Sequence, residues 1–230
     1  MKSSEETSGI NSSLPMNARN FDKTFFRCSV KRFGDVVFAL VALVLASPLF
    51  VLITLLVKLS SAGPIFYVQE RVGRNYRRFG CIKFRTMYSE ADDLLLNLLD
   101  KSPELKIEFE RDFKLRKDPR ITPVGMFMRR SSLDELPQFI NIIMGHMSLV
   151  GPRPIVEKEI PKYGDFMDTI VSVRPGLTGL WQVSGRNNLS YQRRVQLDFI
   201  YATNRSLLLD IRVILRTFGV LLFPRDRGAY

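Results

Sequence analysis

The 230-residue chain contains only two cysteines and one histidine. Cys28 and Cys81 have neither the spacing of a metal site nor the pattern of a disulfide framework, which fits a reducing compartment. Because His146 is the one histidine, a histidine-rich metal site is excluded, and acid–base chemistry must fall mainly to carboxylates. Glycine-rich nucleotide-binding motifs, HExxH and paired CxxC motifs are also missing, and no internal repeat is visible.

Positive charge is in clear excess, with 34 Lys and Arg against 23 Asp and Glu, a net charge of +11. Such a surplus indicates an anionic partner, which can be nucleic acid, phospholipid or a phosphorylated substrate. Hydrophobic residues make up 46% of the chain, which is enough for a sizeable core. The length suits one medium-sized domain with an appendage.

The beginning of the chain is polar and rich in serine and asparagine. It lacks the apolar region of a signal peptide, so we predict a disordered tail over residues 1–26. The composition then changes twice, first to an apolar segment over residues 27–60 and then to a soluble-type domain over residues 61–230.

From Val36 to Val57 the chain is almost wholly apolar, for about the ~20 residues that cross a bilayer. A buried core helix is the alternative, although few soluble helices are apolar on every side for so long. Ser47 and Pro48 interrupt the run. Because proline lacks an N–H and clashes with the carbonyl four residues earlier, we predict a break there, where the Ser47 hydroxyl can satisfy freed backbone groups.

Basic residues flank both ends of the apolar run. They are Arg27, Lys31 and Arg32 before it, and Lys58, Arg71, Arg74, Arg77 and Arg78 after it. Positive charge prefers the cytoplasmic side of a membrane. A re-entrant hairpin, which enters and leaves through the same face, satisfies this rule at both ends. We therefore favour the hairpin and keep a full span as the alternative.

The remainder of the chain mixes strand and helix signals. Strands are predicted in GPIFYVQERVG and RFGCIKFRTM, and helices in SEADDLLLNLLDKSPELKIEFERDF, with a break near Pro103, and in LPQFINIIMGHMS. Two more helices are predicted in SYQRRVQLDFIYATNRS and LLLDIRVILRTFGVLLF. In the last, Arg212 and Arg216 share a face, which suits either an interfacial helix or a terminal core helix. The predicted fold class is α+β, with a membrane hairpin, a mainly helical domain that carries short strands, and amphipathic interfacial helices.

The stretch RRSSLDELPQFINIIMGHMSLVGPRP sets Asp134 and Glu135 between two arginines and a Gly-Pro-Arg-Pro turn. Ser132 and Glu135 have the spacing of a capping box, so one interpretation is that the two acids only decorate a helix N-terminus. The other interpretation is chemical. A carboxylate at such a place stays ionised, and it can coordinate Mg²⁺ or attack phosphorus as a nucleophile.

Basic residues accompany the acidic pair, and guanidinium groups match phosphate oxygens with paired hydrogen bonds. The candidates are Arg129, Arg153 and Arg186, together with Lys83 and Arg85, which share one face of a predicted strand. A solvated strand face, an ordinary turn and a surface loop are the plainer interpretations of these segments. Their combination beside an apolar run favours transfer of a diphosphate substrate at a membrane surface.

Four segments together resemble the bacterial sugar transferases, which are monotopic polyprenyl-phosphate phosphoglycosyl transferases. The segments are KRFGDVVFALVALVLASPLF, KFRTM, DPRITPVGMFMRRSSLDELPQFINIIMGHMSLVGPRP and RPGLTGLWQVSGRN. The resemblance covers residues 29–222, with order and spacing kept. The short length and the RDRGAY ending look closest to exopolysaccharide-production members that transfer galactose 1-phosphate. Longer relatives carry extra membrane helices upstream, so this chain looks like the compact form.

The resemblance implies that a sugar 1-phosphate, of galactose or glucose, passes from a UDP-sugar to undecaprenyl phosphate with release of UMP. This would be the first membrane step of an exopolysaccharide or another surface polysaccharide. The family pattern makes Asp134 the nucleophile that carries the phosphosugar covalently, and Glu135 its assistant, as Mg²⁺ ligand or as base. The family's phosphate-binding residues fall on Lys83, Arg129, Arg153 and Arg186, with Arg85 ranked lower, and its membrane helix breaks at Ser47 and Pro48.

The same resemblance implies a place in the bacterial inner membrane, in contact with phospholipids, with the catalytic domain facing the cytoplasm. The expected partners are the UDP-sugar and undecaprenyl phosphate, the expected cofactor is Mg²⁺, and a homodimer is plausible. A membrane-anchored scaffold without catalysis and a nucleic-acid-binding protein are the alternatives. The apolar run and the lack of an aromatic–basic stripe argue against nucleic acid.

Overall fold

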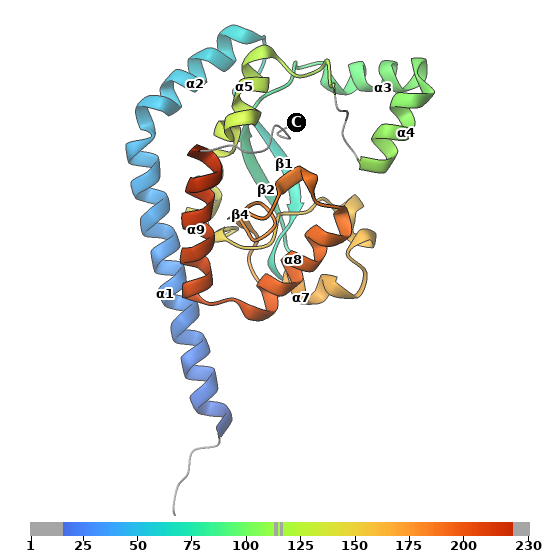
Figure 1. Ribbon diagram of the computed structural model, residues 1–230. Helices are drawn as coiled ribbons and strands as arrows, with labels where there is room; N and C mark the ends of the chain where they lie inside the picture. The colour runs from blue at the N-terminus through green and yellow to red at the C-terminus, as the bar shows by residue number, and fades with distance from the viewer. Residues whose placement is uncertain (1–15, 113–114, 116, 223–230) are drawn as a thin grey trace, which may run out of the picture.

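The structure is a computed structural model that describes residues 16–112, 115 and 117–222. Its helices are α1 (Met16–Leu45), α2 (Ser47–Ser60), α3 (Ala91–Lys101), α4 (Pro103–Asp112), α5 (Pro123–Ser131), α6 (Gln138–Ile143), α7 (Met167–Val171), α8 (Tyr191–Asn204) and α9 (Leu207–Leu222). Its strands are β1 (Phe66–Val72), β2 (Arg78–Phe84), β3 (Ser148–Val150) and β4 (Gly176–Thr178), and its 3₁₀ turns are η1 (Arg74–Tyr76), η2 (Leu133–Glu135), η3 (Glu157–Lys162), η4 (Gly164–Phe166) and η5 (Arg186–Asn188). This mainly helical arrangement with a few short strands confirms the predicted α+β class (Figure 1).

A long helix and its bent continuation form one side of the molecule (Figure 1). The predicted tail over residues 1–26 lies partly outside the described residues, and from Met16 onward it is part of α1. Within the described part, no single helix is long and apolar enough to cross a membrane. By length and composition alone, Ser29–Leu45 and Ser47–Ser60 meet that standard as a pair, and a bend of 64° separates them.

The bend falls at the Ser-Pro step. Pro48 has no N–H to offer the carbonyl of Val44, four residues earlier. The Ser47 hydroxyl donates a hydrogen bond to that same carbonyl over 2.8 Å, so the acceptor is satisfied although the helical ladder is interrupted. The regular ladder resumes at once, because the amide of Phe50 donates to the carbonyl of Ala46 at 2.8 Å.

Strands β1 and β2 form an antiparallel hairpin at the centre of the domain, with Phe66 opposite Phe84 and Val72 opposite Arg78. Both strands were predicted, and both predictions are confirmed. Alternation along β2 puts Cys81 and Lys83 on one face and Phe84 on the other. The face of Lys83 also carries Phe79 and Cys81 into the main core, while the opposite face brings Phe84 to α2, so both faces of β2 pack.

Aromatic packing connects the bent helices to this hairpin. The Phe84 ring lies 4.8 Å from the ring of Phe50 on α2 and 5.4 Å from the ring of Phe66 on β1. Ile53 and Val57 of α2 are buried in the same cluster. The strand that carries Lys83 is therefore positioned by the helix pair, because its end is part of one apolar cluster with α2.

A second, parallel pair of strands lies in the main core. Ser148 pairs with Gly176, and Val150 pairs with Thr178. The surrounding cluster takes buried side chains from β2, α6, α8 and α9, namely Phe79, Cys81, Phe139, Ile142, Met147, Leu149, Val150, Tyr201 and Val213, together with Ala39 of α1. This core fixes the chain that leaves β3 toward the Gly-Pro-Arg-Pro turn.

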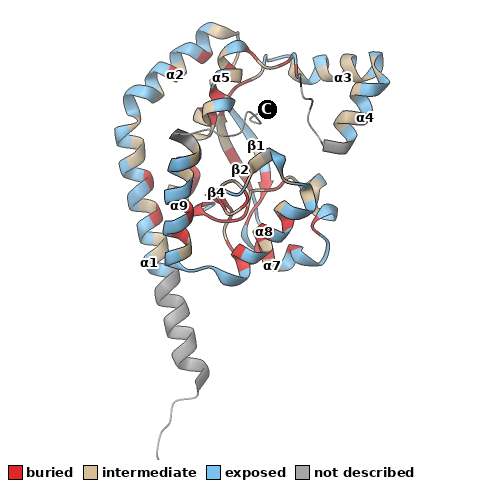
Figure 2. Ribbon diagram, in the orientation of Figure 1, coloured by how far each residue is buried: buried red, intermediate tan, exposed pale blue. Residues whose placement is uncertain are grey.

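Helices α3 and α4 form an arm that projects away from α1 (Figure 1). The break between them falls at Ser102 and Pro103, which confirms the predicted position. No residue of α3 is buried, and Figure 2 shows both helices as mainly exposed or half-buried.

The last helix, α9, lies beside α1 and turns one side outward (Figures 1 and 2). Val213 and Asp210 face the core, whereas Arg212 and Arg216 are exposed. Leu208, Ile211, Leu215 and Phe218 are exposed as well, at helical spacing. The helix is thus anchored in the core on one side and exposes apolar and basic side chains on the other, so the core role is confirmed and the interfacial role stays a prediction.

The contact between α5 and the loop after β2 leaves no space for a side chain at Gly125. A Cβ there would lie 2.0 Å from the carbonyl oxygen of Thr86. We expect Gly125→Ala to destabilise the fold by about 1–3 kcal/mol, because α5 must move away from this loop. Thermal unfolding of the detergent-solubilised chain measures the effect.

Gly219→Ala is the matched control, since a Cβ at Gly219 meets nothing within 4 Å and the residue lies in α9. The control should keep or slightly raise stability, because alanine favours a helix over glycine by roughly 0.5–1 kcal/mol. Equal unfolding midpoints for the two variants would contradict the predicted clash.

Candidate active site

The two predicted carboxylates lie in the short turn η2, which is reached through an unusual backbone conformation. Helix α5 ends at Ser131, and Ser132 follows with φ 60° and ψ 17°. This left-handed conformation costs a residue other than glycine roughly 1–2 kcal/mol. The reversal lets Leu133 pack against the cluster around Phe84 and buries Asp134, which is 8% exposed.

The capping box predicted from Ser132 and Glu135 is wrong. Ser132 makes no side-chain cap, and its left-handed conformation serves the end of α5 instead, where its amide donates to the carbonyl of Arg129. The Glu135 carboxylate points to a lysine rather than back to the turn. The pair is held by tertiary contacts, which local spacing does not encode.

Glu135 is fixed from two elements. The Lys83 ammonium of β2 donates to its carboxylate at 2.5 Å, and the Gln138 side chain of α6 also hydrogen-bonds to it. Burial opposes ionisation of Glu135, but the charges of Lys83 and Arg153 and these two hydrogen bonds outweigh it. The pKa of Glu135 is therefore lowered, and the residue stays ionised at neutral pH.

Asp134 has the opposite balance. Burial and the adjacent negative charge of Glu135 raise the pKa of Asp134 to about 6, although Lys83, Arg129 and a backbone hydrogen bond counteract them. Asp134 is thus mainly ionised near pH 7, but it is less stabilised as an anion than an ordinary aspartate. A carboxylate in this state is suited to react with, or bind to, an electrophilic or cationic centre.

Arg129 lies at the end of α5, close enough to Asp134 to influence its pKa. Its Nε donates to the hydroxyl of Thr86 at 2.9 Å, which orients the guanidinium from the strand side. Burial lowers the pKa of Arg129, and the charges of Asp134 and Asp118 raise it. The terminal nitrogens of this half-buried arginine can therefore face a second anion beside Asp134.

Arg153 follows β3 in the Gly-Pro-Arg-Pro turn. Its backbone N–H donates to the buried carboxylate of Asp198 on α8, so this hydrogen bond attaches the turn to α8. Burial raises the pKa of Asp198 well above its usual range, and the Arg153 amide and charge oppose that shift. The guanidinium lies 5.7 Å from the centre of the Trp181 ring and influences Glu135 electrostatically.

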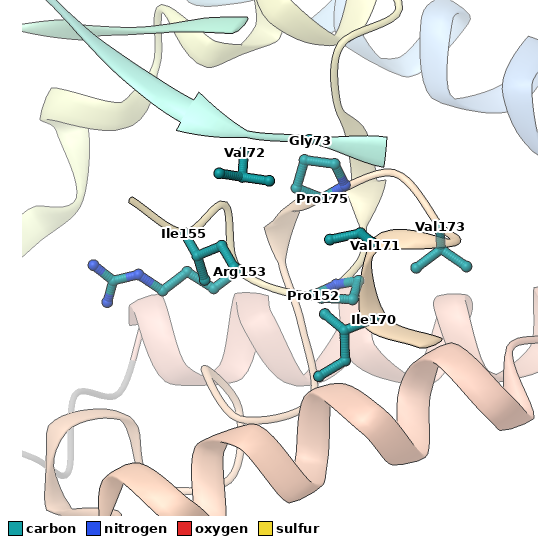
Figure 3. Close-up of a pocket in the computed structure, with 9 residues that line it drawn as sticks. All are labelled: Val72, Gly73, Pro152, Arg153, Ile155, Ile170, Val171, Val173 and Pro175. Carbon is teal, nitrogen blue, oxygen red and sulfur yellow. The ribbon is translucent and has the colours of Figure 1, made fainter. Parts of the chain in front are cut away.

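The small pocket behind this turn is apolar. Figure 3 shows the guanidinium of Arg153 extending away from the side chains of Ile170, Val171 and Val173, which line the pocket with other apolar residues. A phosphate has no donors in such a place. The polar side of the turn, toward Glu135 and Trp181, is therefore the side that can bind an anion.

Arg186 lies in η5 with φ 48°, in the glycine-rich loop. Its amide donates to the carbonyl of Trp181 at 3.2 Å, and the Trp181 ring is also 5.2 Å from the Arg194 guanidinium. The buried indole of Trp181 thus lies near two guanidiniums, those of Arg153 and Arg194, whereas Arg186 meets Trp181 through the backbone. Within the described residues, no side-chain hydrogen bond or ion pair connects Arg186 with Arg153, Asp134 or Glu135, so its predicted role at the phosphate stays a prediction.

Two glycines of the segment RPGLTGLWQVSGRN, residues 174–187, approach the protein backbone closely. A Cβ on Gly176 would lie 2.1 Å from the amide nitrogen of Gly151, and one on Gly179 would lie 2.3 Å from its carbonyl oxygen. These glycines allow the loop to pack directly under the turn that carries Arg153.

Arg85 is the predicted phosphate-binding residue that the structure places elsewhere. Its guanidinium donates to the carbonyls of Ser61 and Ala62 at 2.7 and 2.6 Å, at the end of α2. Its side chain is buried, at 7% exposure. Although it alternates with Lys83 in sequence, Arg85 follows the end of β2 and serves to close α2 rather than to meet Glu135.

Sequence reasoning missed four polar residues that position this site: Thr86, Gln138, Asn141 and Asp198. Asn141 is 1% exposed, and its amide group accepts from the amide of Ile82 and donates to the carbonyl of Gly80, at 2.9 and 2.7 Å. It therefore holds β2 against α6 immediately beside Lys83. A polar residue within an apolar helical run was the one signal available for Asn141.

A divalent cation has two carboxylates to bind here. Within the described residues no group of three or more histidines, cysteines or acids is arranged for a metal. Mg²⁺ does not require one, because it is commonly held by one or two carboxylates together with substrate phosphates and water. Burial first, and then the charge of Glu135, raise the pKa of Asp134; a cation would offset both, so the pair fits Mg²⁺.

The geometry thus joins a buried, weakly stabilised aspartate, a glutamate bound to a lysine, and arginines on two sides. Comparison with known proteins agrees with this chemistry, since the profile of the family described as "Bacterial sugar transferase" matches residues 26–224. The chain belongs to the bacterial sugar transferase family. The resemblance inferred from the sequence is therefore confirmed.

Several members of the bacterial sugar transferase family are close in sequence. An "Exopolysaccharide production protein ExoY" of Sinorhizobium fredii is 46% identical over 200 residues, which are 87% of this chain and 88% of that protein. The "Undecaprenyl-phosphate galactose phosphotransferase" of Salmonella typhimurium is 46% identical over 201 residues, covering 87% of this chain and 42% of its own length. The "UDP-glucose:undecaprenyl-phosphate glucose-1-phosphate transferase" of Escherichia coli is 35% identical over 196 residues, covering 82% and 39%.

The match covers the relatives to different extents. This chain spans less than half the length of the Salmonella and Escherichia transferases, but most of the Sinorhizobium protein. The described site residues all lie inside the matched segment, residues 26–224.

The raised pKa of Asp134 predicts a pH-dependent stability. Its value of about 6 lies above the ordinary 3.8, so the folded chain favours the neutral form of Asp134. The resulting contribution to folding stability is complete below pH ~4 and is lost as the pH rises through ~6. Without divalent cations, Asp134→Asn should therefore be more stable than the unmodified chain at pH 8, by about 2–3 kcal/mol. Urea unfolding at a series of pH values measures the difference.

The difference between the two chains should close toward pH 4, where both carry a neutral group at position 134. Asp100→Asn, which replaces an exposed carboxylate on α3, is the control and should change stability little at any pH. A destabilised Asp134→Asn variant at pH 8 would show that the carboxylate is stabilised in the fold rather than disfavoured.

Proposed function

We propose that this chain transfers a sugar 1-phosphate from a UDP-sugar to undecaprenyl phosphate, releases UMP, and thereby begins the synthesis of an exopolysaccharide or another surface polysaccharide. The observation that carries the proposal is the buried Asp134, with its raised pKa, beside cations that reach it from β2 and α5. The names of its relatives support the same reaction class, since they include undecaprenyl-phosphate sugar phosphotransferases.

In the first step a carboxylate oxygen of Asp134 attacks the phosphorus that bears the sugar. A bond forms between this oxygen and phosphorus, the phosphoanhydride bond to UMP breaks, and UMP leaves with the electron pair. The buried, weakly stabilised state of Asp134 favours the attack, because forming the ester removes a charge that its surroundings disfavour. Arg129, oriented by Thr86, is placed to stabilise the charge on the transferring phosphoryl group.

In the second step a phosphate oxygen of the lipid attacks the same phosphorus. The bond to Asp134 breaks, its carboxylate is restored, and the sugar leaves as an undecaprenyl diphosphate ester. Glu135 is held by Lys83 and Gln138 and stays ionised through both steps. Arg153, whose guanidinium lies against the Trp181 ring, and Arg186 are the proposed contacts for the remaining phosphate oxygens.

We propose Mg²⁺ as the cofactor, held by Asp134 and Glu135 together with the substrate phosphates. When bound, the ion supplies charge neutralisation on the diphosphate and on the leaving UMP. The charge of Glu135 acts on Asp134, and Lys83 fixes the Glu135 carboxylate, which supports a partly preformed site. Galactose is the sugar that we favour, because the relative named for galactose is 46% identical and the one named for glucose is 35% identical.

We further propose that α1 and α2 enter and leave the inner membrane from its cytoplasmic face. The bend at the Ser-Pro step and the exposed apolar residues on both sides of it support a re-entrant hairpin, and these residues are Val37, Leu40, Val41, Val44, Leu45, Val51, Leu52 and Leu55. The exposed apolar stripe of α9 supports a position at the lipid surface. The Phe50–Phe84 contact would then hold the strand of Lys83 next to the membrane.

A membrane scaffold without catalysis is the weaker interpretation. Such a protein has no need of a buried aspartate that a neighbouring glutamate disfavours as an anion, because the arrangement weakens the fold. A nucleic-acid-binding role is likewise disfavoured, since the basic residues at the site surround two carboxylates, which would repel a phosphate backbone in the absence of a cation.

Replacement of Asp134 tests the covalent step. Asp134→Asn should abolish UMP release from UDP-galactose and UDP-glucose in a single turnover without lipid acceptor, because the amide cannot form the phosphoester. Quantifying UMP by chromatography, with Mg²⁺ present, measures this half-reaction. Trapped unmodified enzyme should carry a hexose phosphate on the peptide that contains residue 134, as seen by mass spectrometry.

Asp100→Asn, the exposed control, should release UMP as the unmodified chain does. Normal single-turnover release by Asp134→Asn would refute the covalent step. UMP release by Asp134→Asn that occurs only after undecaprenyl phosphate is added would instead indicate direct attack by the lipid phosphate.

Single cysteines test the re-entrant hairpin. Two variants are made separately in a Cys28→Ser background. Ser29→Cys places an exposed thiol before the helix pair's bend, and Glu90→Cys places one after α2 in the sequence. Both should react with a membrane-impermeant maleimide in inverted membrane vesicles and remain unreactive in intact cells, because a hairpin returns both ends to the cytoplasm. Opposite labelling of the two positions would establish a full span instead.

A further inference from the structure

A second basic pocket lies apart from the acidic pair, where the beginning of the membrane helix meets the corner between α8 and α9. It is a small pocket that opens to solvent. Five cationic side chains line it: Lys31, Arg32, Arg74, Arg174 and Arg205, with Ser148, Val150, Val173 and Tyr201. We infer that this pocket binds the phosphate headgroup of an anionic phospholipid.

The charge of the pocket is only partly neutralised by the protein. Lys31 is paired with Asp210 at 2.7 Å and lies 3.8 Å from Asp35, so these two acids account for the lysine. Within the described residues, no carboxylate forms an ion pair with Arg32, Arg74 or Arg205. The pocket therefore keeps a positive charge that an anion would balance.

Several of the arginines are already held in place by neutral acceptors. Arg32 donates to the carbonyls of Ile143 and Met147 at 3.0 and 3.4 Å. The Nε of Arg74 donates to the carbonyl of Ser172 at 3.1 Å, and the Nε of Arg174 donates to that of Gly145 at 2.9 Å. These bonds orient the side chains without cancelling their charge, which lowers the entropy cost of binding an anion.

The surroundings of the pocket indicate a phosphate that carries acyl chains. On α1, Arg32 is followed by Phe33, which is 74% exposed. On the other wall, Arg205 is followed closely by Leu207 and Leu208, which are 43% and 58% exposed. A cationic pocket whose lining segments also expose apolar residues matches a lipid headgroup better than a free phosphate or a nucleotide.

The inference rests on the proposed membrane hairpin, because Lys31 and Arg32 lie one turn before the apolar run and so at headgroup depth. It does not rest on the proposed chemistry, since the pocket shares no lining residue with Lys83, Arg129, Asp134 or Glu135. Headgroup binding at this corner would fix how α1, α8 and α9 sit against the membrane surface.

The test uses the full chain in a neutral detergent and a fluorescent phosphatidylglycerol as the probe. The double variant Arg74→Gln with Arg205→Gln should bind the probe about thirtyfold more weakly, as expected for two basic residues near an anionic headgroup. Arg77→Gln with Arg193→Gln is the control, because both side chains are exposed, neither lines the pocket, and the net charge changes equally. The control should bind as the unmodified chain does.

Two more measurements decide the assignment. Arg205→Glu alters an exposed side chain and should weaken binding of the phosphatidylglycerol probe at least as strongly. In every variant, the UMP release that depends on Asp134, measured with soluble UDP-sugar and no lipid acceptor, should stay normal. Equal weakening in the pocket and control variants would overturn the pocket in favour of diffuse attraction. Displacement of the probe by inorganic phosphate as readily as by unlabelled phosphatidylglycerol would overturn the lipid assignment.

Discussion

The arrangement depends on one electrostatic constraint: two adjacent carboxylates lie in a mainly buried turn, and only cations from other elements make this tolerable. Lys83 lowers the pKa of Glu135 against the effect of burial, so that glutamate keeps its charge. Ionisation of Asp134 is therefore unfavourable, since burial and Glu135 together raise its pKa to about 6. The fold is weakened at the one residue that the proposed reaction requires to be an effective nucleophile.

That constraint explains why so many buried polar residues surround the turn. Asn141 holds β2 in the position from which Lys83 reaches Glu135, and Thr86 orients Arg129. Gly125 allows α5 to approach the loop that carries Thr86, and a side chain there would separate them. Each residue fixes a cation rather than a carboxylate, because a displaced cation would leave the two negative charges uncompensated.

The helices and strands of this fold were largely predictable from the sequence, whereas the tertiary contacts between them were not. The strands around Val68 and Ile82, the helix break at Pro103 and the interruption at Pro48 follow from local alternation and from the lost N–H of proline. Asp134 and Glu135 were found because an acidic pair among arginines is unusual, and the family resemblance then assigned their roles, which stay predictions.

The errors have a common physical origin in contacts between residues far apart in the sequence. Ser132 and Glu135 have capping spacing, but the tertiary bond from Lys83 takes the glutamate away. Arg85 has the alternation that predicts a shared face with Lys83, but three carbonyls at the end of α2 take up its guanidinium. Neither outcome can be read from spacing, because each is decided by a partner that lies 20 or more residues away along the chain.

The contact between Arg85 and α2 also links the proposed membrane segment to the site. Arg85 closes the end of α2, Phe84 packs on Phe50 of the same helix, and Lys83 holds Glu135, so three consecutive residues join the helix pair to the acidic turn. A lipid phosphate must reach the same point as a water-soluble nucleotide in the proposed reaction. A nucleophile fixed rigidly to the element that sets membrane depth meets this requirement, because any tilt of the hairpin would move Lys83 and the carboxylates together.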